Sequence, residues 1–401
     1  MLLKSLVLRN FRNYSDLELE FPGSINLIVG DNAQGKTNLL EAIYLLCTAK
    51  SHRTRMDNEL IKHGEDGFYL KGIFESQYSP CQRGGKGGAS STKSIGFRSW
   101  VEISNTLLGL KRVKINGTLQ QKTSNLIGQT SVVIFSPESL TLVKGGPADR
   151  RKFLDTFISQ INLAYLRFLQ NYQLALKQRN ELLKQIREKR ATVDLLDSWD
   201  KQLIEIGTNI MKMRAEIIAK LAREARERHK ELTESDENLE IIYQGSFKNH
   251  DAQSKYLISH YDNALNEARN IDIFKGVTSI GPHRDDLIIL VNNFEARRFG
   301  SQGQHRTIAL AFKLAEIDLI LSETEELPII LLDDVASELD FNRVTFLFNL
   351  LDKLNAQVFV TTTHSNNSCS LRSPTTSAYG LTLSKCTIFE VENGIINVSN
   401  T

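Results

Sequence analysis

One eight-residue string restricts the fold of this chain more than any other feature. Residues 30–37 read G-D-N-A-Q-G-K-T and match the phosphate-binding loop pattern G-x-x-x-x-G-K-[ST] in full. The apolar run Ile25–Val29 precedes the loop and predicts a buried strand, and a helical apolar pattern follows from Leu39 to Leu46. A chance glycine-rich turn is the alternative, and the strand and helix on either side argue against it. The pattern therefore predicts an α/β fold built around a P-loop.

Each residue type in the loop suits a phosphate ligand. The glycines let backbone N–H groups surround phosphate oxygens, and the N-terminus of the helix adds its dipole. Lys36 can neutralise the terminal phosphates, and Thr37 can bind Mg²⁺. We therefore expect ATP and Mg²⁺ as cofactors. The residues expected to bind ATP are Gly30, Asp31, Asn32, Ala33, Gln34, Gly35, Lys36, Thr37 and Asn38.

A second apolar run ends in two aspartates. Ile329–Leu332 predicts a buried strand that delivers Asp333 and Asp334 at its carboxyl end. Beside a P-loop, Asp333 is expected to hold Mg²⁺ with Thr37, and Asp334 to orient or deprotonate the attacking water. A strand ending in aspartate is common by itself, so this assignment depends on the P-loop in the same chain.

Further short motifs follow the same order along the chain. Ser301, Gly303 and Gln304 precede a helical pattern, so a hydroxyl and backbone amides could face an anion at a helix N-terminus. The string Ser337-Glu338-Leu339-Asp340 comes directly after the acidic strand. His364 follows the apolar strand Val358–Thr362. A histidine at a strand end is usually structural, but His364 stands where a γ-phosphate sensor would be expected.

The middle of the chain has a helical pattern. Apolar residues recur at steps of three and four from Tyr165 to Ile186, with an interruption at Arg179, and again from Leu203 to Ile217. Two long amphipathic helices packed as a hairpin explain this pattern, and they form a compact lobe rather than a long coiled coil.

We therefore predict a head that is split around an inserted lobe. Residues 1–135 and 240–401 form the predicted head, and residues 136–239 form the helical lobe. Residues 77–94 and 365–377 are polar, with little apolar content, and are predicted to be mobile surface insertions.

Charge is unevenly distributed along the chain. Residues 140–230 carry 19 Lys and Arg against 11 Asp and Glu, so this segment has a net charge of +8 within a chain whose net charge is +2. Such a basic segment fits a polyanionic partner, and a solvated basic helix face is an equally good reading. Arg150 and Arg151 could also anchor the lobe to the head. The candidate phosphate contacts are Arg150, Arg151, Arg223, Arg226 and Arg228.

The lengths of the apolar runs and the spacing of the cysteines indicate the cellular compartment. The first apolar run is short and alternates like a strand, and no apolar stretch approaches the roughly 20 residues of a membrane span. Four scattered cysteines suggest neither a disulfide framework nor a zinc site. We expect a cytoplasmic protein with no membrane partner.

The ordered motifs resemble the ABC-type ATPase heads of the SMC group, and within it the RecF family of bacterial recombination mediators. The resemblance covers nearly the whole chain. The strings that carry it are Leu8–Tyr14, Asp31–Ile43, Ser136–Glu138, Gly145–Pro147, Arg150–Asp155, Gly281–Leu287, Ser301–Leu310 and Asp333–Asp340.

The resemblance implies an α/β, ABC-type (SMC-like) P-loop ATPase head and ATP-driven formation of a homodimer. It also implies double-stranded DNA, gapped or at a junction, held across the dimer, and work with RecO and RecR in loading RecA. Ser301, Gly303 and Gln304 would contact the γ-phosphate bound to the other subunit, and Ser337 and Asp340 would form the D-loop. Arg53 resembles the arginine just after the P-loop helix in SMC heads, although a surface salt bridge is an equally good reading.

The chain departs from the family pattern at several positions. Gly300 and Gln302 replace the first and third residues of the motif Leu-Ser-Gly-Gly-Gln. Asp334 stands where many relatives have glutamate, and its shorter side chain suggests slow turnover suited to a switch. The residue of the Q-loop is not identified, and Glu138 is only a candidate.

Three functions compete at this point. The first is a DNA clamp switched by a weak, DNA-stimulated ATPase, in which hydrolysis releases the DNA. The second is the ATPase subunit of a transporter, against which stand the Arg9–Tyr14 motif and the basic lobe. The third is an ATPase of another DNA-processing complex that is associated with a nuclease. Asp285 and Asp286 form the only other adjacent pair of aspartates, and after Gly281 and Pro282 they suggest a structural turn.

Overall fold

The computed structural model describes residues 1–76, 97–234, 237–248, 252, 255–363 and 386–400. Contacts between Cα atoms divide the chain into two compact units. The first unit contains Met1–Leu140 and Glu316–Thr401, and the second contains Thr141–Ala315. The boundary at residue 315 falls inside one helix, α8 (Gln302–Thr324).

The first unit contains two sheets and a few helices. Its elements are β1 (Leu2–Phe11), β2 (Tyr14–Glu20), β3 (Ile25–Val29), α1 (Lys36–Thr48), β4 (Gly67–Ser76), β5 (Phe97–Thr106), β6 (Arg112–Ile115), β7 (Thr118–Leu119), β8 (Val132–Phe135), β12 (Ile329–Leu332), α9 (Val335–Glu338), α10 (Phe341–Leu354), β13 (Val358–Thr362), β14 (Cys386–Glu392) and β15 (Ile395–Asn400).

The mostly parallel sheet positions the P-loop. Its strand order is β15-β14-β3-β13-β12-β8, and only the edge strand β15 is antiparallel to its neighbour. Strands β3, β8, β12 and β13 are buried along their whole length, which explains why they appear in the sequence as nearly continuous apolar runs. The bounds predicted for β3, β12 and β13 match the structure. Because β13 separates β3 from β12, the P-loop and Asp333 emerge on either side of one strand at the carboxyl edge of the sheet.

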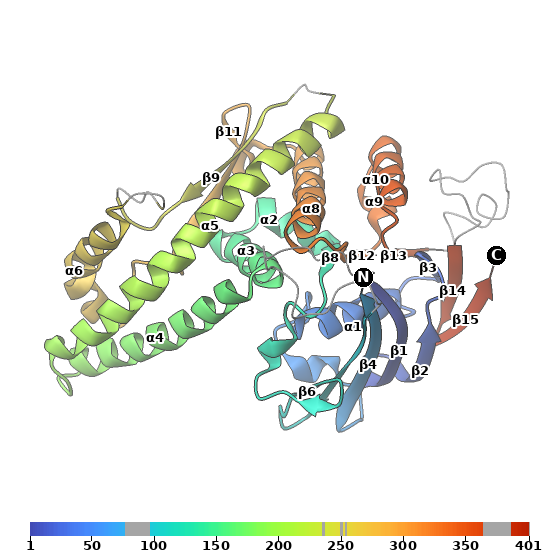
Figure 1. The fold of residues 1–401 in the computed structure, drawn as a ribbon, viewed down its shortest axis with the longest axis horizontal. Coiled ribbons are helices and arrows are strands. Elements are labelled where there is room, and N and C mark those ends of the chain that lie inside the picture. Colours follow the sequence, from blue (N-terminus) through green and yellow to red (C-terminus); the bar gives the residue numbers. More distant parts are fainter. Residues whose placement is uncertain (77–96, 235–236, 249–251, 253–254, 364–385, 401) are drawn as a thin grey trace, which may run out of the picture. The chain divides into compact units, whose positions relative to one another are not determined.

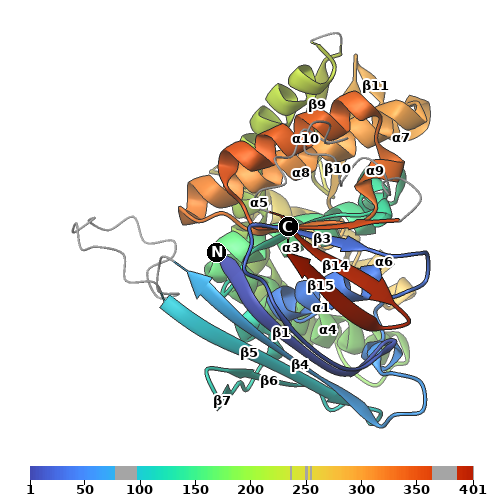
Figure 2. The ribbon, with the colours of Figure 1, turned by 90° about the vertical axis from the view of Figure 1, so that its right-hand side faces the viewer.

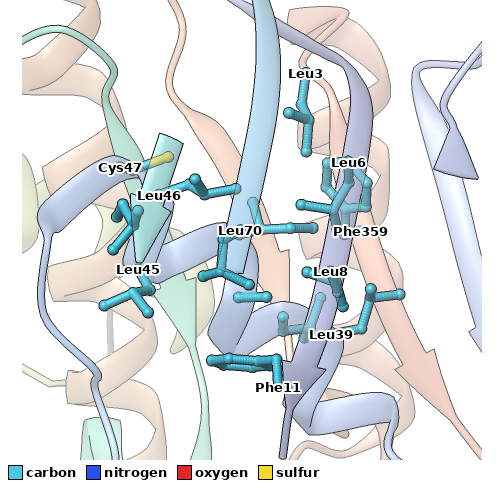
Figure 3. Close-up of a cluster of buried hydrophobic side chains, with 14 of the residues drawn as sticks. Leu3, Leu6, Leu8, Phe11, Leu39, Leu45, Leu46, Cys47, Leu70 and Phe359 are labelled. Carbon is cyan, nitrogen blue, oxygen red and sulfur yellow. The ribbon is translucent and has the colours of Figure 1, made fainter. Parts of the chain in front are cut away.

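The second sheet of this unit is antiparallel. Its order is β2-β1-β4-β5-β6-β7 (Figure 2), and β4 alternates buried and half-buried side chains over its ten residues. Helix α1 contacts strands of both sheets. Its buried face joins one continuous apolar core with Leu6 of β1, Leu70 of β4 and Phe359 of β13 (Figure 3). The helix that starts at the P-loop is therefore fixed by apolar packing along its length.

The second unit is mainly helical. Its elements are α2 (Thr141–Lys144), α3 (Pro147–Ile161), α4 (Leu163–Arg187), α5 (Leu196–Leu232), β9 (Leu239–Gln244), α6 (Leu257–Lys275), β10 (Asp286–Val291), β11 (Phe294–Glu295), α7 (Ala296–Phe299) and the first part of α8. Helices α4 and α5 lie side by side, as the hairpin pattern predicts (Figure 1). None of the described helices is both long enough and apolar enough to cross a membrane.

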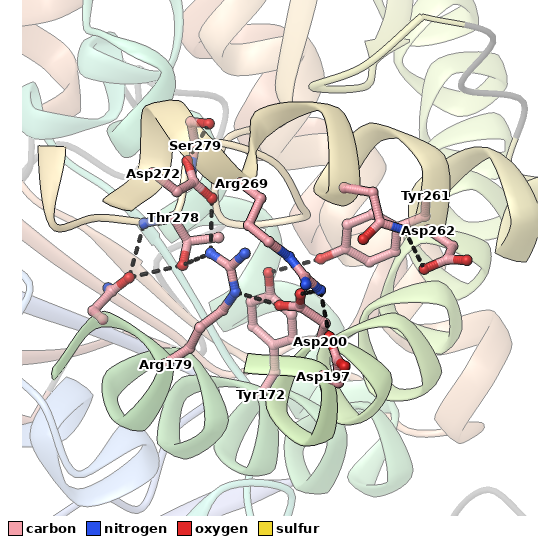
Figure 4. Close-up of polar contacts among 12 residues, drawn as sticks. Tyr172, Arg179, Asp197, Asp200, Tyr261, Asp262, Arg269, Asp272, Thr278 and Ser279 are labelled. Carbon is pink, nitrogen blue, oxygen red and sulfur yellow. Dashed lines mark hydrogen bonds and ion pairs between the residues drawn. The ribbon is translucent and has the colours of Figure 1, made fainter. Parts of the chain in front are cut away.

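Arg179 explains the interruption in the apolar pattern of α4. Its side chain is fully buried, and its guanidinium donates to Asp200 of α5 at 2.5 Å and to Asp272 of α6 at 2.7 Å (Figure 4). Arg269 donates to Asp200 as well, at 2.7 Å. A buried charge with two carboxylate partners ties three helices together in one register, and loss of one partner would leave an uncompensated buried charge.

The second unit extends further along the chain than the predicted lobe. We predicted that the lobe ends at residue 239, but residues up to Ala315 belong to the same compact unit. The reason is tertiary: β9 packs on α5, β10 pairs with β9, and α6 packs on α4 and α5. Strands β9 and β10 therefore belong to the second unit, although nearly all of their residues fall in the predicted head segment 240–401. The predicted insertions 77–94 and 365–377 lie outside the described residues.

Candidate nucleotide-binding site

The P-loop joins β3 to α1 with Lys36 folded over it. Lys36 is 8% exposed, and its ammonium donates to the carbonyl oxygens of Gly30 and Asp31, both at 2.7 Å. Burial lowers the pKa of Lys36, while the nearby carboxylates of Asp334 and Asp333 act in the opposite direction. An ammonium held over the loop in this way is positioned to bind an anionic ligand.

Two glycines of the loop have no room for a side chain. A Cβ on Gly30 would lie 2.4 Å from the carbonyl oxygen of Val391 in β14. Gly35 has a φ of +117°, and a Cβ there would lie 2.5 Å from the side-chain nitrogen of Asn13. Both positions therefore require glycine for reasons of packing as well as for access to phosphate.

Thr37 and Asp333 come together from distant parts of the sequence. The hydroxyl of Thr37 donates to Asp333 Oδ1 at 2.9 Å, and the hydroxyl of Thr361 in β13 donates to the same oxygen at 2.8 Å. Burial raises the pKa of Asp333, the two hydroxyl donors lower it, and the charge of Glu138 raises it further. Glu138, our candidate for the Q-loop, therefore lies close to this carboxylate.

This pair of oxygens fits Mg²⁺. The ion prefers oxygen ligands and usually takes one or two from the protein and the rest from substrate phosphates and water. A hydroxyl and a buried carboxylate at hydrogen-bond distance provide that set. Among the described residues, no group of three or more His, Cys, Asp or Glu side chains could hold a metal ion alone. The fit therefore depends on phosphate oxygens completing the coordination.

Asp334 adopts a strained backbone conformation directly after β12. Its φ is +51°, in the left-handed region, and its backbone nitrogen donates to Thr361 Oγ1 at 2.9 Å. Such strain is uncommon for a residue other than glycine and is concentrated at functional sites. Among the nearby carboxylates, Asp334 does most to raise the pKa of Lys36. It therefore lies near the P-loop, as the predicted role in orienting water requires.

Arg53 is held beside the first turns of α1. Its Nη1 donates to Asn38 Oδ1 at 3.1 Å and lies 3.7 Å from Glu41 Oε2. Glu41 is fully buried, and burial alone would raise its pKa, but hydrogen bonds from Arg12 and Ser51 hold that pKa below its usual value. The charge of Arg53 also lowers the pKa of Asp333. The surface-salt-bridge reading is thus too simple, because the partner of Arg53 is a buried carboxylate on the P-loop helix.

The predicted signature residues form the start of α8 in the second unit. The backbone nitrogen of Ser301 donates to Gln304 Oε1 at 2.8 Å, and the backbone nitrogen of Gln304 donates to Ser301 Oγ at 3.1 Å. This reciprocal pair is a capping box. Ser301 and Gly303 are exposed, and a Cβ on Gly303 would meet only Ser301 Oγ, at 3.8 Å. The start of α8 is therefore an open helix N-terminus of the kind that binds anions.

Comparisons with known proteins agree with this arrangement. A family model described as the RecF/RecN/SMC N terminal domain matches residues 2–382. The DNA replication and repair protein RecF of Natranaerobius thermophilus is 46% identical over 370 residues, which are 90% of this chain and 91% of that protein. The chain belongs to the RecF family.

Further relatives support this assignment. The DNA replication and repair protein RecF of Bacillus cytotoxicus is 43% identical over 90% of this chain and 92% of that protein. A solved structure titled as the recombination mediator protein RecF with ATP, in the RecFOR pathway, has a TM-score of 0.86 and 35% identity, and covers 99% of this chain and 97% of that one. An Smc head domain from Pyrococcus furiosus has a TM-score of 0.55 at 16% identity, covering 99% of this chain and 95% of that one. It shares the fold, so this RecF-family chain has the predicted ABC-type, SMC-like architecture.

The remaining predicted site residues of this RecF-family chain are only partly described. Asp340 is the N-cap of α10 and accepts a hydrogen bond from the backbone nitrogen of Arg343 at 3.0 Å. The side chain of Ser337 and the whole of His364 lie outside the described residues. Their predicted roles in the D-loop and in sensing the γ-phosphate stay predictions.

The predicted phosphate contacts have internal partners. Arg150 is buried and makes a two-bond ion pair with Asp286, which lies in the predicted head segment 240–401, so this contact fits the anchoring alternative better than a phosphate contact. Arg151 donates to the carbonyl oxygen of Asp285 at 2.7 Å. The remaining three all lie on α5. Arg223 pairs with Glu224, Arg226 donates to the carbonyl oxygen of Leu239, and Arg228 pairs with Glu231.

Asp285 and Asp286 are structural, as the turn reading predicts. Asp285 accepts hydrogen bonds from the Tyr243 hydroxyl at 2.5 Å and from the backbone nitrogen of Ser246 at 2.9 Å. Asp286 holds Arg150. Both carboxylates therefore stabilise the second unit through hydrogen bonds within it.

Sequence reasoning missed the residues that support the loop. Asn13 and Tyr14 contact P-loop carbonyls, Glu41 anchors Arg53, and Thr361 holds both Asp333 and the backbone of Asp334. Asn13 and Tyr14 lie in the family-like string Leu8–Tyr14, and for the other two the signal is a polar residue inside an apolar helical or strand pattern. Glu41 on the apolar side of the helix and Thr361 near the end of an apolar strand both carry it.

Proposed function

We propose that this chain acts in the cytoplasm as an ATP-dependent DNA-binding protein of recombinational repair and replication-fork maintenance. It closes as a homodimer on ATP, clamps double-stranded DNA near gaps, and helps load RecA together with RecO and RecR. Hydrolysis then opens the dimer and releases the DNA. Family membership and the names of the relatives, which are replication and repair proteins, support this proposal.

The single observation that carries the proposal is the meeting of Thr37 with Asp333. The two side chains are 296 residues apart in the chain, and their oxygens lie 2.9 Å apart beside a full P-loop. A hydroxyl and a carboxylate in that position provide the protein ligands for Mg²⁺ in nucleotide hydrolysis. Thr37 and Asp333 would hold Mg²⁺ there, and the bound ion would supply positive charge to offset that of the phosphates.

The chain's own groups supply the rest of the proposed chemistry. Lys36 balances phosphate charge, the P-loop N–H groups hold the phosphates, and Asp334 orients the attacking water. Aspartate reaches less far than glutamate by one methylene, so we expect slow turnover, stimulated by DNA. This weak ATPase acts as a timer for release rather than as a source of work.

Sedimentation with ATP and DNA tests the proposal. We expect wild-type protein with Mg²⁺ and ATP to sediment as a dimer and to retain gapped double-stranded DNA without cutting it. Lys36→Arg should bind nucleotide only weakly, fail to hydrolyse it and lose DNA retention, because a planar guanidinium cannot replace a compact ammonium at the phosphates.

Two results would count against the proposal. Wild-type turnover in Lys36→Arg would show that the P-loop assignment is wrong. Nicking of the gapped DNA would favour the nuclease-associated alternative, which Asp285 and Asp286 do not support because both have internal partners.

A further inference from the structure

The turn between β1 and β2 lies directly against the P-loop. Asn13 Nδ2 donates to the carbonyl oxygen of Gln34 at 2.8 Å, and the Tyr14 hydroxyl donates to the carbonyl oxygen of Gly35 at 3.0 Å. Two successive carbonyl groups of the P-loop are therefore held from outside by two successive residues of one turn.

Peptide geometry gives these two contacts a consequence for the ligand side of the loop. The carbonyl of Gln34 belongs to the same planar peptide unit as the N–H of Gly35, and the carbonyl of Gly35 belongs to the unit that contains the N–H of Lys36. In a trans peptide the C=O and N–H bonds point in opposite directions. Holding both carbonyls against the turn therefore directs both N–H groups away from it. They lie at the start of α1, where backbone N–H groups have no partner within the helix.

The orientation of the Asn13 amide is itself fixed. Arg53 Nη1 donates to Asn38 Oδ1 at 3.1 Å, and Asn38 Nδ2 donates to Asn13 Oδ1 at 2.9 Å. With its oxygen accepting from Asn38, Asn13 presents its nitrogen to Gln34. Every donor in this chain of hydrogen bonds, starting from a guanidinium, points toward the P-loop carbonyl, and such chains strengthen each member.

Packing fixes the same arrangement from two sides. Tyr14 is fully buried, and a Cβ on Gly35 would lie 3.0 Å from its hydroxyl oxygen. On the other side, the backbone nitrogen of Asn393, in the turn between β14 and β15, donates to Gln34 Oε1 at 2.6 Å. Gln34 is thus held at its carbonyl by Asn13 and at its side chain by the backbone of Asn393.

We propose that Asn13 and Tyr14 are positioning residues that orient the N–H groups of Gly35 and Lys36 toward the phosphates of the nucleotide. Neither side chain touches the phosphates in this role; each acts through a peptide unit of the P-loop. The proposal rests on the proposed nucleotide-binding function and assigns a role to the strand pair that opens the chain.

Calorimetry with a non-hydrolysable ATP analogue and Mg²⁺ tests this role in the full chain. We expect Tyr14→Phe and Asn13→Ala each to weaken binding of the analogue about fivefold, because each removes one ordinary hydrogen bond that holds the bound conformation. The control is Tyr44→Phe, which removes a tyrosine hydroxyl on α1 about two turns beyond the P-loop. It should bind as the wild type does.

Asn13→Asp separates positioning from packing. Aspartate has nearly the size of asparagine and can still accept from Asn38, but its ionised carboxylate cannot donate to Gln34. Positioning predicts a loss of affinity at least as large as that of Asn13→Ala that persists at high salt, where repulsion between the new carboxylate and the phosphates is screened, whereas a packing role predicts wild-type affinity there. Asn13 is half-buried, so this variant carries the test if Tyr14→Phe does not fold.

Melting temperatures without nucleotide complete the experiment. Positioning predicts that Asn13→Asp melts close to the Tyr44→Phe control while its affinity falls. Wild-type affinity in Asn13→Asp and Tyr14→Phe would overturn the inference while leaving the proposed function intact. Failure of the wild-type protein to bind the analogue would instead contradict the proposed function.

Discussion

At the scale of single residues, His283 is a half-buried base that loss of solvent keeps neutral. Its Nδ1 lies 2.8 Å from the Tyr172 hydroxyl, and its Nε2 lies 3.0 Å from the carbonyl oxygen of Thr278. The carbonyl can only accept, so we assign the proton to Nε2 and let Nδ1 accept from Tyr172. Burial lowers the pKa of His283 to about 4.

This lowered pKa predicts a loss of stability in mild acid. The unfolded chain binds a proton with a pKa of about 6.5, whereas folded His283 remains neutral until about pH 4. Its contribution is complete above the unfolded pKa and is lost as the pH falls toward the folded one. We expect the free energy of unfolding to fall by about 1 kcal/mol between pH 7 and pH 5.5 from this residue.

Urea unfolding of the wild type and of His283→Gln at both pH values measures the effect. Glutamine can donate and accept hydrogen bonds but does not titrate in this range. The variant should therefore be less stable at pH 7, yet lose less stability on acidification. Equal pH dependence in the two proteins would show that His283 is not the neutral group described here.

At the scale of elements, the start of α8 combines a structural and a predicted functional demand. Ser301 caps the helix through Gln304, and Gln304 Nε2 also donates to Glu237 Oε1 at 2.8 Å. The Ser301 hydroxyl accepts in the capping box, so its own proton remains able to donate to a phosphate oxygen. Capping and phosphate binding are thus compatible in one side chain.

Ser301→Arg is predicted to separate ATP binding from dimerisation. The isolated subunit should bind ATP nearly normally, because its own P-loop does so. ATP-driven dimerisation and hydrolysis should both be lost, because a bulky side chain enters the space required by the partner's γ-phosphate. Analytical ultracentrifugation with and without ATP measures the first effect, and phosphate release measures the second.

Ser301→Ala is the matched control for the helix cap. It loses the same cap, at a cost of about 1 kcal/mol to the helix, but adds no bulk. We expect it to dimerise more weakly than the wild type and more strongly than Ser301→Arg. Normal ATP-driven dimers of Ser301→Arg would mean that the nucleotide site is not shared between subunits.

At the scale of the whole molecule, the net charge of +2 conceals a basic segment of +8. The structure divides this segment into buried and accessible cations. Arg150, Arg179 and Arg214 are buried and paired with carboxylates, whereas Arg223 is 72% exposed. A count of charges therefore overstates what a polyanion can reach, and the exposed Arg223 with the half-buried Arg226 and Arg228 of α5 are better candidates than these buried arginines.

Replacing Arg223, Arg226 and Arg228 together by glutamine tests these candidates. If all three face DNA phosphates, the slope of log K against log[salt] should flatten by roughly 0.9 for each lost contact. Titration of labelled duplex DNA at several salt concentrations measures the slope. The matched control replaces Lys177, Lys189 and Lys275, three exposed cations elsewhere in the second unit. Equal slopes for the wild type and the α5 variant would return these arginines to the solvated-face reading.

The sequence by itself determined the elements that local patterns specify. Strands β3, β12 and β13 were predicted with their observed bounds, because a strand buried on both faces is apolar over most of its length. The P-loop and the Asp333 strand end were found for the same reason, since each combines a local pattern with a fixed motif. The helical hairpin followed from its spacing of three and four.

Tertiary structure alone decided which distant residues meet. Strands β14 and β15 were not predicted, yet β14 pairs with β3 and places Asn393 against Gln34. Asn13 and Tyr14 reach the P-loop only because β1 and β2 form a tight turn beside α1. The second unit extends to Ala315 because β9 packs on α5, and Arg150 is buried because Asp286, 136 residues away, meets it there. Periodicity records which face of an element is buried, but not which other element covers it, and that choice depends on the packing of the whole chain.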